Sequence, residues 1–225
     1  MRSLAVIPAR GGSKRIPRKN IKEFLGHPVM WYPIQASLKV FDKTVVSTED
    51  KEIKQVALEC GAEVVDRPRE FADDFTPTGI VTAETAKLFP DYDLVACIYP
   101  TAVFVTPQLL REAMERLGDA DCIFPMVRYS HPIQRALKIE GGLVKFANPE
   151  FRNVRTQDCS PRYNDAGQFY IMHREPLIEH RNIYFERMVP LILSESQVQD
   201  MDTLDDWKIA EIKYEMQHGG GVERR

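Results

Sequence analysis

Hydrophobic and polar positions alternate between two patterns along the first 127 residues. Short apolar runs of strand length are separated by segments in which apolar residues recur at helical spacing. The predicted strands are residues 3–7, 44–47, 63–65, 94–99 and 122–127. The predicted helices are residues 29–39, 51–60, 78–88 and 107–117. This alternation predicts an α/β fold with a mostly parallel sheet that is covered by helices on both faces.

Residues at the predicted helix ends support these boundaries. Asp50 is a candidate N-cap for the second helix, and Gly61 follows the end of that helix. Thr106 is a candidate N-cap for the fourth helix, with Pro107 in the favoured first position. Pro33 is expected in the first turn of the first helix, where a missing N–H is tolerated.

The α/β alternation breaks between residues 130 and 169. Residues 133–139 and 143–146 predict a β-hairpin around Glu140-Gly-Gly142, so we expect a β-rich excursion that serves as an arm, a lid or a subunit contact. Regular structure resumes with predicted strands at 168–172 and 189–193 and a helix at 203–217. Residues 218–225 predict a frayed tail. No linker divides residues 1–225, so we expect a single domain.

Composition narrows the function classes. The chain has 225 residues, of which 44% are hydrophobic and 28% charged, as in ordinary globular domains. A formal net charge of -3 argues against nucleic acid as a partner. The four cysteines form no CxxC pair, which favours reduced thiols over disulfides or zinc. We expect a cytoplasmic protein without a membrane segment, because no leader or long apolar run is present.

Basic residues gather in the loop after the first strand. Residues 7–20 read Ile-Pro-Ala-Arg-Gly-Gly-Ser-Lys-Arg-Ile-Pro-Arg-Lys-Asn, at the sheet edge where open α/β folds bind ligands. Gly11 and Gly12 allow the backbone to approach an anion closely, and a triphosphate can be surrounded by Arg10, Lys14 and Lys19. The spacing matches neither a Walker P-loop nor a GxGxxG motif. From chemistry alone, a solvated basic loop is the alternative.

Asp200 and Asp202 form a second candidate site. Alternate residues of an extended segment lie on one face of the backbone, so both carboxylates can approach one cation. Mg²⁺ prefers carboxylate oxygens and takes waters and substrate phosphates as its remaining ligands. The alternative is that Asp202 caps the helix that begins near Thr203.

The string at residues 7–20 resembles the signature of the CMP-sugar cytidylyltransferases that activate sialic acid and its bacterial relatives. Four further motifs follow in the order of that family, namely Val46-Ser-Thr-Glu-Asp50, Arg67-Pro68, Pro100-Thr101 and Gln199-Asp-Met-Asp-Thr203. The resemblance covers nearly the whole chain. It implies a Rossmann-like nucleotidyltransferase fold that binds CTP over the first loop, with a nine-carbon 2-keto sugar acid as the second substrate.

The resemblance also implies roles for individual residues. The phosphates and the cytidine would be contacted by Arg10, Gly11, Ser13, Lys14, Lys19, Asn20, Arg67 and Thr78. Of these, Arg10, Lys14 and Lys19 would be catalytic, and Asp200 and Asp202 would hold Mg²⁺. An exposed loop corner is the alternative for Arg67. The five histidines are scattered, and no general base stands out.

The acceptor side differs from the sialic-acid pattern. Tyr99 replaces a Gln, and residues 132–138 together with Asp165-Ala-Gly-Gln-Phe-Tyr170 resemble the pseudaminic acid branch of the family. Ile171 departs from that branch, which has an aromatic residue there. The implied substrate-binding residues are Tyr99, Thr101, Arg135, Lys138, Arg155, Gln168, Phe169 and Tyr170. Asp74 and Asp165 are weaker candidates for sugar contacts. The aromatic residues could instead only fill the core.

The resemblance places a dimer-forming excursion at residues 130–169, so we expect a homodimer in which Arg155 reaches the sugar carboxylate, within its own subunit or across the interface. Within the family, synthetases for sialic acid, legionaminic acid and 2-keto-3-deoxy-octonic acid are the alternatives. A non-catalytic nucleotide-sugar sensor is disfavoured because both aspartates are present. A nucleic-acid-binding module would need a broad basic face.

Overall fold

The computed structural model describes residues 1–73 and 75–219 and confirms the predicted α/β fold. The strands are β1 (Ser3–Pro8), β2 (Glu23–Phe24), β3 (His27–Pro28), β4 (Lys43–Thr48), β5 (Glu63–Asp66), β6 (Leu94–Ile98), β7 (Cys122–Arg128), β8 (Leu137–Glu140), β9 (Leu143–Phe146), β10 (Tyr163–Asp165), β11 (Phe169–His173) and β12 (Met188–Leu193). The helices are α1 (Trp31–Leu38), α2 (Lys51–Glu59), α3 (Thr78–Lys87), α4 (Pro107–Leu117), α5 (Arg174–His180) and α6 (Leu204–Gln217). Two predictions fall outside the described residues: the weaker sugar-contact candidate Asp74 and most of the predicted tail, residues 220–225.

The main sheet has the order β10-β7-β11-β6-β1-β4-β5, with β12 paired to β7. Strands β1, β4, β5 and β6 run parallel, whereas β11 inserts antiparallel between β6 and β7. The chain therefore crosses from β1 to β4 on one side and later returns to β6 on the other. Such a switch point opens a crevice at the carboxyl ends of the strands, where ligands bind in this class of fold.

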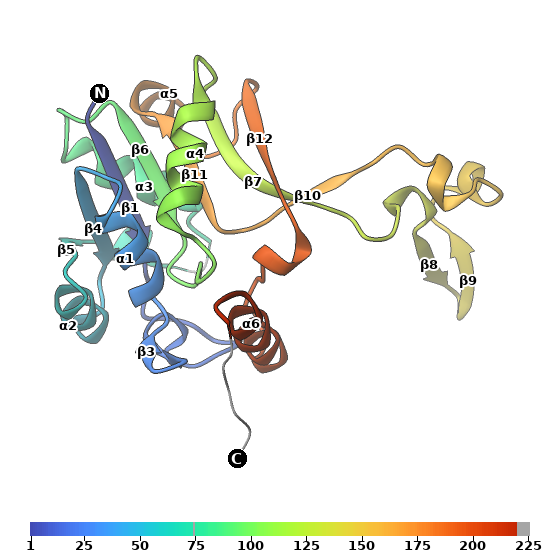
Figure 1. The fold of residues 1–225 in the computed structure, drawn as a ribbon, viewed down its shortest axis with the longest axis horizontal. Coiled ribbons are helices and arrows are strands. Elements are labelled where there is room, and N and C mark those ends of the chain that lie inside the picture. Colours follow the sequence, from blue (N-terminus) through green and yellow to red (C-terminus); the bar gives the residue numbers. More distant parts are fainter. Residues whose placement is uncertain (74, 220–225) are drawn as a thin grey trace.

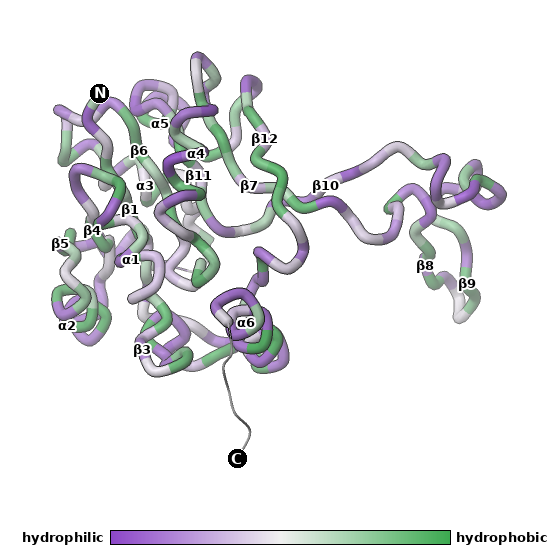
Figure 2. The backbone as a smooth tube through the Cα atoms, viewed as in Figure 1, coloured by the Kyte–Doolittle hydropathy of each residue, from purple (hydrophilic) through white to green (hydrophobic). Residues whose placement is uncertain are grey.

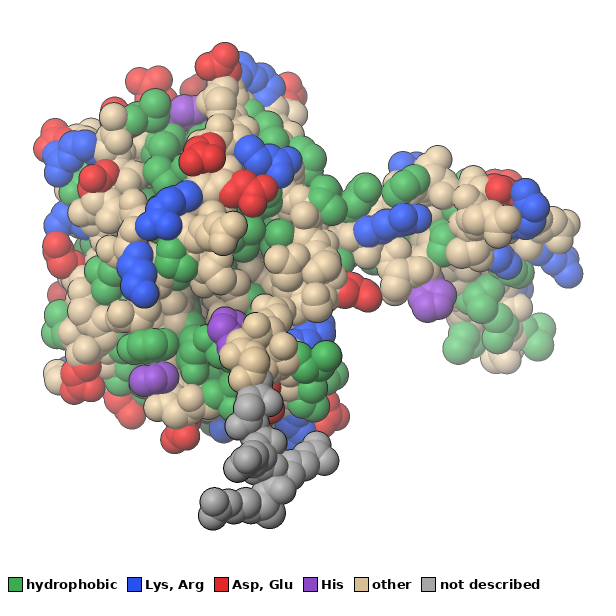
Figure 3. Space-filling view, viewed as in Figure 1, with side chains coloured by type: hydrophobic (Ala, Val, Ile, Leu, Met, Phe, Trp, Pro, Cys, Tyr) green, Lys and Arg blue, Asp and Glu red, His purple; other side chains and the backbone are tan. Residues whose placement is uncertain are grey.

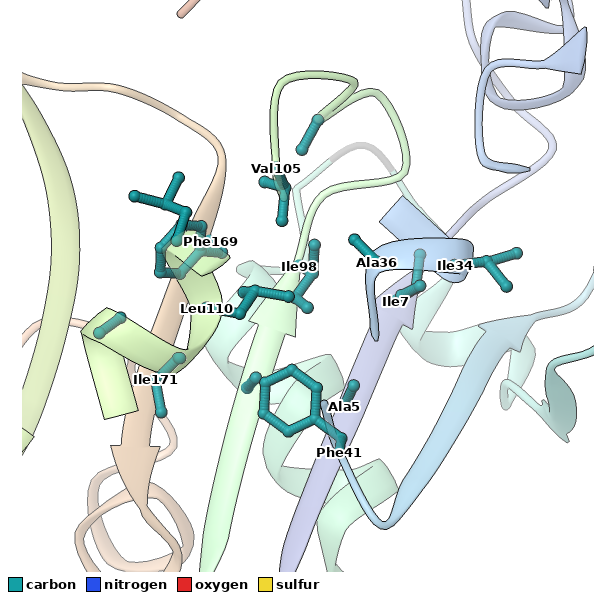
Figure 4. Packing of buried hydrophobic residues seen from close by; sticks show 14 of the residues in the cluster. Ala5, Ile7, Ile34, Ala36, Phe41, Ile98, Val105, Leu110, Phe169 and Ile171 are labelled. Carbon is teal, nitrogen blue, oxygen red and sulfur yellow. The ribbon is translucent and has the colours of Figure 1, made fainter. Parts of the chain in front are cut away.

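Helices cover both faces of the sheet (Figure 1). On one face, Leu110 of α4 and Ile34 of α1 pack with the inward side chains of β1, β6 and β11 (Figure 4). On the other face, Ala83 of α3 and Leu177 of α5 pack against the alternate residues of the same strands. Each central strand is thus buried on both sides, which explains its continuous apolar sequence.

A smaller core holds the C-terminal helix against the N-terminal half. Trp207 and Ala210 of α6 pack with Phe24 and Tyr32, and the rings of Phe24 and Trp207 meet edge-on at 5.7 Å. Met201, just before α6, is fully buried in this cluster. The packing brings the segment that contains the two predicted metal-binding aspartates to the loop after β1.

Most of the excursion predicted at residues 130–169 leaves the main body as a projecting arm that carries the β8–β9 hairpin (Figure 1). The predicted range is too long at its C-terminal end, because residues 163–169 return to the main sheet as β10 and the start of β11. The hairpin was predicted correctly, but its first strand is shorter than predicted. Residues 133–135 form a 3-10 turn after Pro132, and the first strand begins only at Leu137. The hairpin contains hydrophobic residues (Figure 2), and apolar side chains lie on its surface (Figure 3), with Ile139 76% accessible.

The ends of the elements follow their capping residues. Asp50 accepts hydrogen bonds from the backbone N–H groups of Glu52 and Ile53, and Thr106 caps α4, as predicted. The capping role considered for Asp202 is wrong, because Thr203 caps α6 in a reciprocal pair with Asp206.

All four cysteines are free and buried. No helix in the described part of the chain has the length and apolar character needed to span a bilayer.

Candidate nucleotide and acceptor site

One cavity of about 570 Å³ opens at the carboxyl edge of the sheet. Its walls come from the loop after β1, the segments after β5 and β6, the start of α3 and the segment before α6. It is lined by Pro8, Arg10, Ser13, Lys14, Arg15, Lys19, Asn20, Arg67, Phe71, Asp73, Thr76, Thr78, Val81, Tyr99, Pro100, Thr101, Asp200 and Asp202. The fold therefore gathers most of the predicted nucleotide-binding residues and both predicted metal-binding residues around one space.

The glycine-containing loop is held by its own backbone and by β4. The Asn20 side chain is buried and donates to the Arg10 carbonyl oxygen at 2.9 Å, which closes the loop on itself. The Gly11 N–H donates to Glu49 Oε1 at 2.8 Å. A Cβ on Gly11 would lie 2.5 Å from Asp50 Oδ2, so only glycine fits there. Glu49 was missed as a functional candidate, although it lies within the quoted motif at residues 46–50.

This arrangement alters the expected roles of two loop residues. Gly11 does not line the cavity, and its N–H is already bound to a carboxylate, so it packs the loop rather than meeting a phosphate. Asn20 lines the cavity, but its side-chain amide already donates a hydrogen bond to the loop backbone. The cations Arg10, Lys14 and Lys19 do line the cavity, where their positive charge can neutralise phosphate oxygens.

The far end of the loop is anchored to the start of α2. Arg18 adopts a left-handed backbone conformation with φ of 55° and pairs with Asp50 at 2.7 Å. The Arg18 hydrogen bond lowers the pKa of Asp50 to about 2, against the smaller opposing effect of burial. Asp50 therefore stays charged at neutral pH and fixes the loop against the helix that it caps.

Arg67 is buried at the inner wall of the cavity. Its Nη2 donates to the Ser47 carbonyl oxygen at 2.8 Å, while its Nε is buried without a hydrogen-bond partner among the described residues. Burial lowers the pKa of this guanidinium, which the nearby Glu49 charge partly offsets. A buried donor without a partner lowers the stability of the fold, and a ligand that accepts a hydrogen bond from it would recover this free energy. The unpartnered Nε is therefore consistent with a ligand-binding role for Arg67. The alternative of an exposed loop corner is wrong.

The two aspartates enter the cavity from the segment before α6. The Asp202 carboxylate pairs with Arg15 Nη1 at 2.5 Å and lies 3.4 Å from Lys19 Nζ. Burial, followed by repulsion from Asp202, raises the pKa of Asp200. The described residues contain no cluster of three or more His, Cys, Asp or Glu that could bind a metal without further ligands.

Tyr99 lines the cavity just after β6 and lies beside a cluster of two further tyrosines, of which Tyr170 is buried and Tyr184 is exposed. Burial raises the pKa of Tyr99 to about 12, so its hydroxyl remains protonated. The Tyr170 ring lies 5.8 Å from the Tyr99 ring. Asp165 Oδ2 accepts hydrogen bonds from the hydroxyls of Tyr170 at 2.5 Å and Tyr184 at 2.7 Å. Tyr184 was not identified from the sequence, because its isolated position after α5 carries no motif.

Two other predicted acceptor contacts belong to the core. Phe169 is fully buried beside Ile98 and Leu110 on the opposite face of β11 from Tyr170, so its place in an acceptor wall was wrong (Figure 4). Gln168 is also buried, and its Nε2 donates to the Gln197 carbonyl oxygen at 2.8 Å. Thr101, in contrast, lines the cavity next to Tyr99.

The three predicted cations of the excursion lie on the arm and do not line the cavity of their own chain. Arg135 donates to Thr156, Lys138 pairs with Glu140 at 2.6 Å, and Arg155 pairs with Asp158 at 2.7 Å. Lys138 and Arg155 are exposed in the single chain, whereas Arg135 is half-buried. None of the cavity-lining residues is a histidine, so the described site offers no imidazole base.

Comparisons with known proteins show which family the chain resembles. Residues 4–205 match the family model described as cytidylyltransferase. The chain is 35% identical to pseudaminic acid cytidylyltransferase of Campylobacter jejuni, over 97% of this chain and 98% of that protein. It is 32% identical to CMP-N,N'-diacetyllegionaminic acid synthase of Legionella pneumophila, over 96% and 97% of the two chains.

Solved structures share the fold at lower identity. CMP:2-keto-3-deoxy-manno-octonic acid synthetase, solved in complex with CTP, superposes with a TM-score of 0.72 and 14% identity over 97% of this chain and 99% of that one. The 4-diphosphocytidyl-2C-methyl-D-erythritol synthase of Anaerococcus prevotii gives a TM-score of 0.63 at 14% identity over 95% and 98% of the two chains. These similarities confirm the Rossmann-like nucleotidyltransferase fold.

Proposed function

Because the chain belongs to the cytidylyltransferase family, we propose that it transfers CMP from CTP to the anomeric hydroxyl of pseudaminic acid and releases pyrophosphate. One observation carries the proposal: the basic residues of the glycine-containing loop, the buried Arg67 and the aspartate pair line a single cavity. The relatives named for pseudaminic acid and legionaminic acid match along nearly the full length of the chain. We also propose a cytoplasmic location.

The parts of the cavity suit the parts of CTP. Arg10, Lys14 and Lys19 supply positive charge for the triphosphate on the side of the glycine-containing loop. Arg67, with an unpartnered Nε, and Thr78, at the start of α3, offer donors to the cytidine at the inner wall. Arg67 directly follows β5 and Thr78 begins α3, so the cytidine would meet a preformed wall of the site.

The aspartate pair fits a Mg²⁺ ion. Two carboxylates are too few for a complete protein-made site, but Mg²⁺ commonly takes one or two carboxylates and completes its shell with waters and substrate phosphates. Burial and like charge disfavour ionisation of Asp200, and a bound cation would relieve both effects. When bound, the ion would neutralise phosphate charge in the transition state.

The residues of the chain would act mainly by positioning and electrostatics. The anomeric hydroxyl attacks the α-phosphorus, the bond from that phosphorus to the bridging oxygen breaks, and pyrophosphate leaves in line. Arg10, Lys14 and Lys19 would offset charge that develops on the equatorial and leaving oxygens. The tyrosine wall would hold the acceptor in the attacking geometry, which itself lowers the barrier.

We propose that the acceptor site is completed by a second copy of the chain. The arm exposes apolar side chains that a partner would cover, including Ile139, Leu143 and Val144. In a homodimer, Arg135 or Arg155 of one subunit could grip the sugar carboxylate in the cavity of the other, since a guanidinium binds a carboxylate through two parallel hydrogen bonds.

The dimer predicts that charge on the hairpin separates the subunits. Light scattering at micromolar concentration should give twice the chain mass of 25.9 kDa for the wild type. Ile139→Asp should shift the protein toward the monomer and lower activity, since burying an unpaired charge at an interface costs several kcal/mol. Leu88→Asp, at an exposed leucine just after α3, should remain dimeric. A monomeric wild type would contradict the proposal.

The function itself is tested by offering the protein each of the four ribonucleoside triphosphates with a panel of 2-keto sugar acids. Pyrophosphate release is expected with CTP and pseudaminic acid. The reason for nucleotide selection is that the buried donors at the inner wall face cytosine acceptors, and a mismatched base leaves them unpaired at about 1–3 kcal/mol each. Equal release from all four triphosphates would contradict the assignment of CTP.

A further inference from the structure

Arg15 is a cavity-lining cation without a role in the proposed reaction. It lies between Lys14 and the anchored end of the loop, and its guanidinium reaches across to the segment before α6, where Nη1 meets Asp202 Oδ2 at 2.5 Å. The side chain is 66% exposed, so little packing holds it in this position. Its observed partner is one of the two carboxylates proposed to bind the divalent cation.

Asp202, one of the two carboxylates proposed to bind the metal, therefore already has cationic partners. Arg15 lies on Oδ2 of Asp202, and Lys19 lies near Oδ1. A divalent cation that approaches Asp202 competes with these positive charges. The competition disfavours binding of the cation alone, because like charges repel and each oxygen of the Asp202 carboxylate already has a cationic neighbour.

Arg15 and Lys19 differ in how easily each side chain can move away from Asp202. Lys19 is only 20% exposed, and its Nζ also donates to the Met201 carbonyl oxygen at 3.0 Å, so it is tied to the backbone. Arg15 is tied to Asp202 by its terminal Nη1, on a long and mostly exposed side chain. Since a guanidinium pairs well with phosphate oxygens, a triphosphate in the same cavity offers it an alternative partner.

We propose that Arg15 is an exchangeable counter-ion, which neutralises Asp202 in the nucleotide-free enzyme and transfers to the triphosphate when CTP and its divalent cation bind. This inference rests on the proposed function, since it requires CTP in the cavity. The exchange keeps each charge paired in both states. It also couples the two ligands, because the cation gains Asp202 only when the nucleotide draws Arg15 away.

The inference predicts opposite effects of one substitution on two binding constants. Mn²⁺ serves as the probe for the cation site, with free Mn²⁺ measured by electron paramagnetic resonance, and CTP binding is measured by calorimetry without an acceptor. Arg15→Gln should tighten Mn²⁺ binding to the nucleotide-free protein about 2–5-fold, because it removes an exposed ion pair. It should weaken CTP binding in the presence of Mn²⁺ about ten-fold, because it removes a charge-assisted contact.

Two control variants separate the exchange from bulk charge and from damage to the loop. Arg15→Lys should leave Mn²⁺ binding near the wild-type value and retain part of the CTP affinity, since the charge remains but the planar fork is lost. Arg116→Gln, which removes the same charge from the exposed surface of α4, should change neither constant.

The outcomes distinguish the inference from the proposed function. A merely structural Arg15 would weaken both ligands together in Arg15→Gln, and this result, or unchanged constants, would overturn the inference alone. A wild-type protein that binds no CTP at all would overturn the proposed function and the inference with it. Tighter Mn²⁺ binding with weaker CTP binding supports the exchange.

Discussion

Asp202→Asn is expected to lower kcat by about 10²-fold or more, the scale seen when one electrostatic contact to a transition state is removed. Asn keeps the size of Asp202 but lacks the negative charge that binds a divalent cation. The fold should persist, because the Asp202 N–H and the α6 cap are held by Asp206. Turnover measured over a range of Mg²⁺ concentrations, with circular dichroism as the fold check, decides the matter.

A matched control lies three residues after Asp202, in the first turn of α6. Asp205 is 90% exposed and does not line the cavity, so Asp205→Asn should keep wild-type turnover. Asp200→Asn should resemble Asp202→Asn. Undiminished turnover in both cavity variants, or in excess EDTA, would contradict the proposal that a bound divalent cation is required for catalysis.

The second large effect concerns the choice of acceptor. The kcat/KM value for pseudaminic acid should exceed that for N-acetylneuraminic acid by about 10²-fold or more. Pseudaminic acid ends in a methyl group, whereas sialic acid carries a polar glycerol tail. Tyr99 presents an aromatic wall to the cavity, and its hydroxyl belongs to a cluster that already satisfies its own hydrogen bonds. Two extra hydroxyls would then lack partners, at about 1–3 kcal/mol each.

The tyrosine cluster explains how the aromatic wall that selects the acceptor keeps its position. Asp165 binds the hydroxyls of both Tyr170 and Tyr184, so the cluster behind Tyr99 is fixed by one carboxylate. Comparison of kcat/KM for pseudaminic, legionaminic and N-acetylneuraminic acids tests the expectation. Equal use of N-acetylneuraminic acid would show the acceptor assignment to be wrong while leaving the assignment of a cytidylyltransferase intact.

The fold was predictable because its signals are local. Apolar strands, helix periodicity and caps such as Asp50 and Thr106 act within a few residues of the position that they define. The two-residue strands β2 and β3 and the short helix α5 were missed because each is too short for a period to appear. The antiparallel insertion of β11 depends on distant pairing with β6 and β7, which no local pattern records.

The candidate site likewise has features that the sequence reveals and features that only the packing of distant segments reveals. The basic loop and the aspartate pair are visible as strings, and the fold brings them together in one cavity. Phe169 and Tyr170 are adjacent in sequence, yet the strand directs one into the core and the other to the tyrosine cluster. The engagement of Gly11 by Glu49 joins residues 38 apart, and only the packing of β4 against the loop reveals it.

The central claim is that this chain moves the α-phosphate of CTP onto a sugar acid. The most direct measurement uses CTP labelled with ³²P at the α-phosphate, incubated with the protein, Mg²⁺ and pseudaminic acid. The account predicts that the label appears in a CMP-sugar product, while unlabelled pyrophosphate is released in equal amount. Label that remains in CTP, or that appears as free CMP without a sugar adduct, would contradict it.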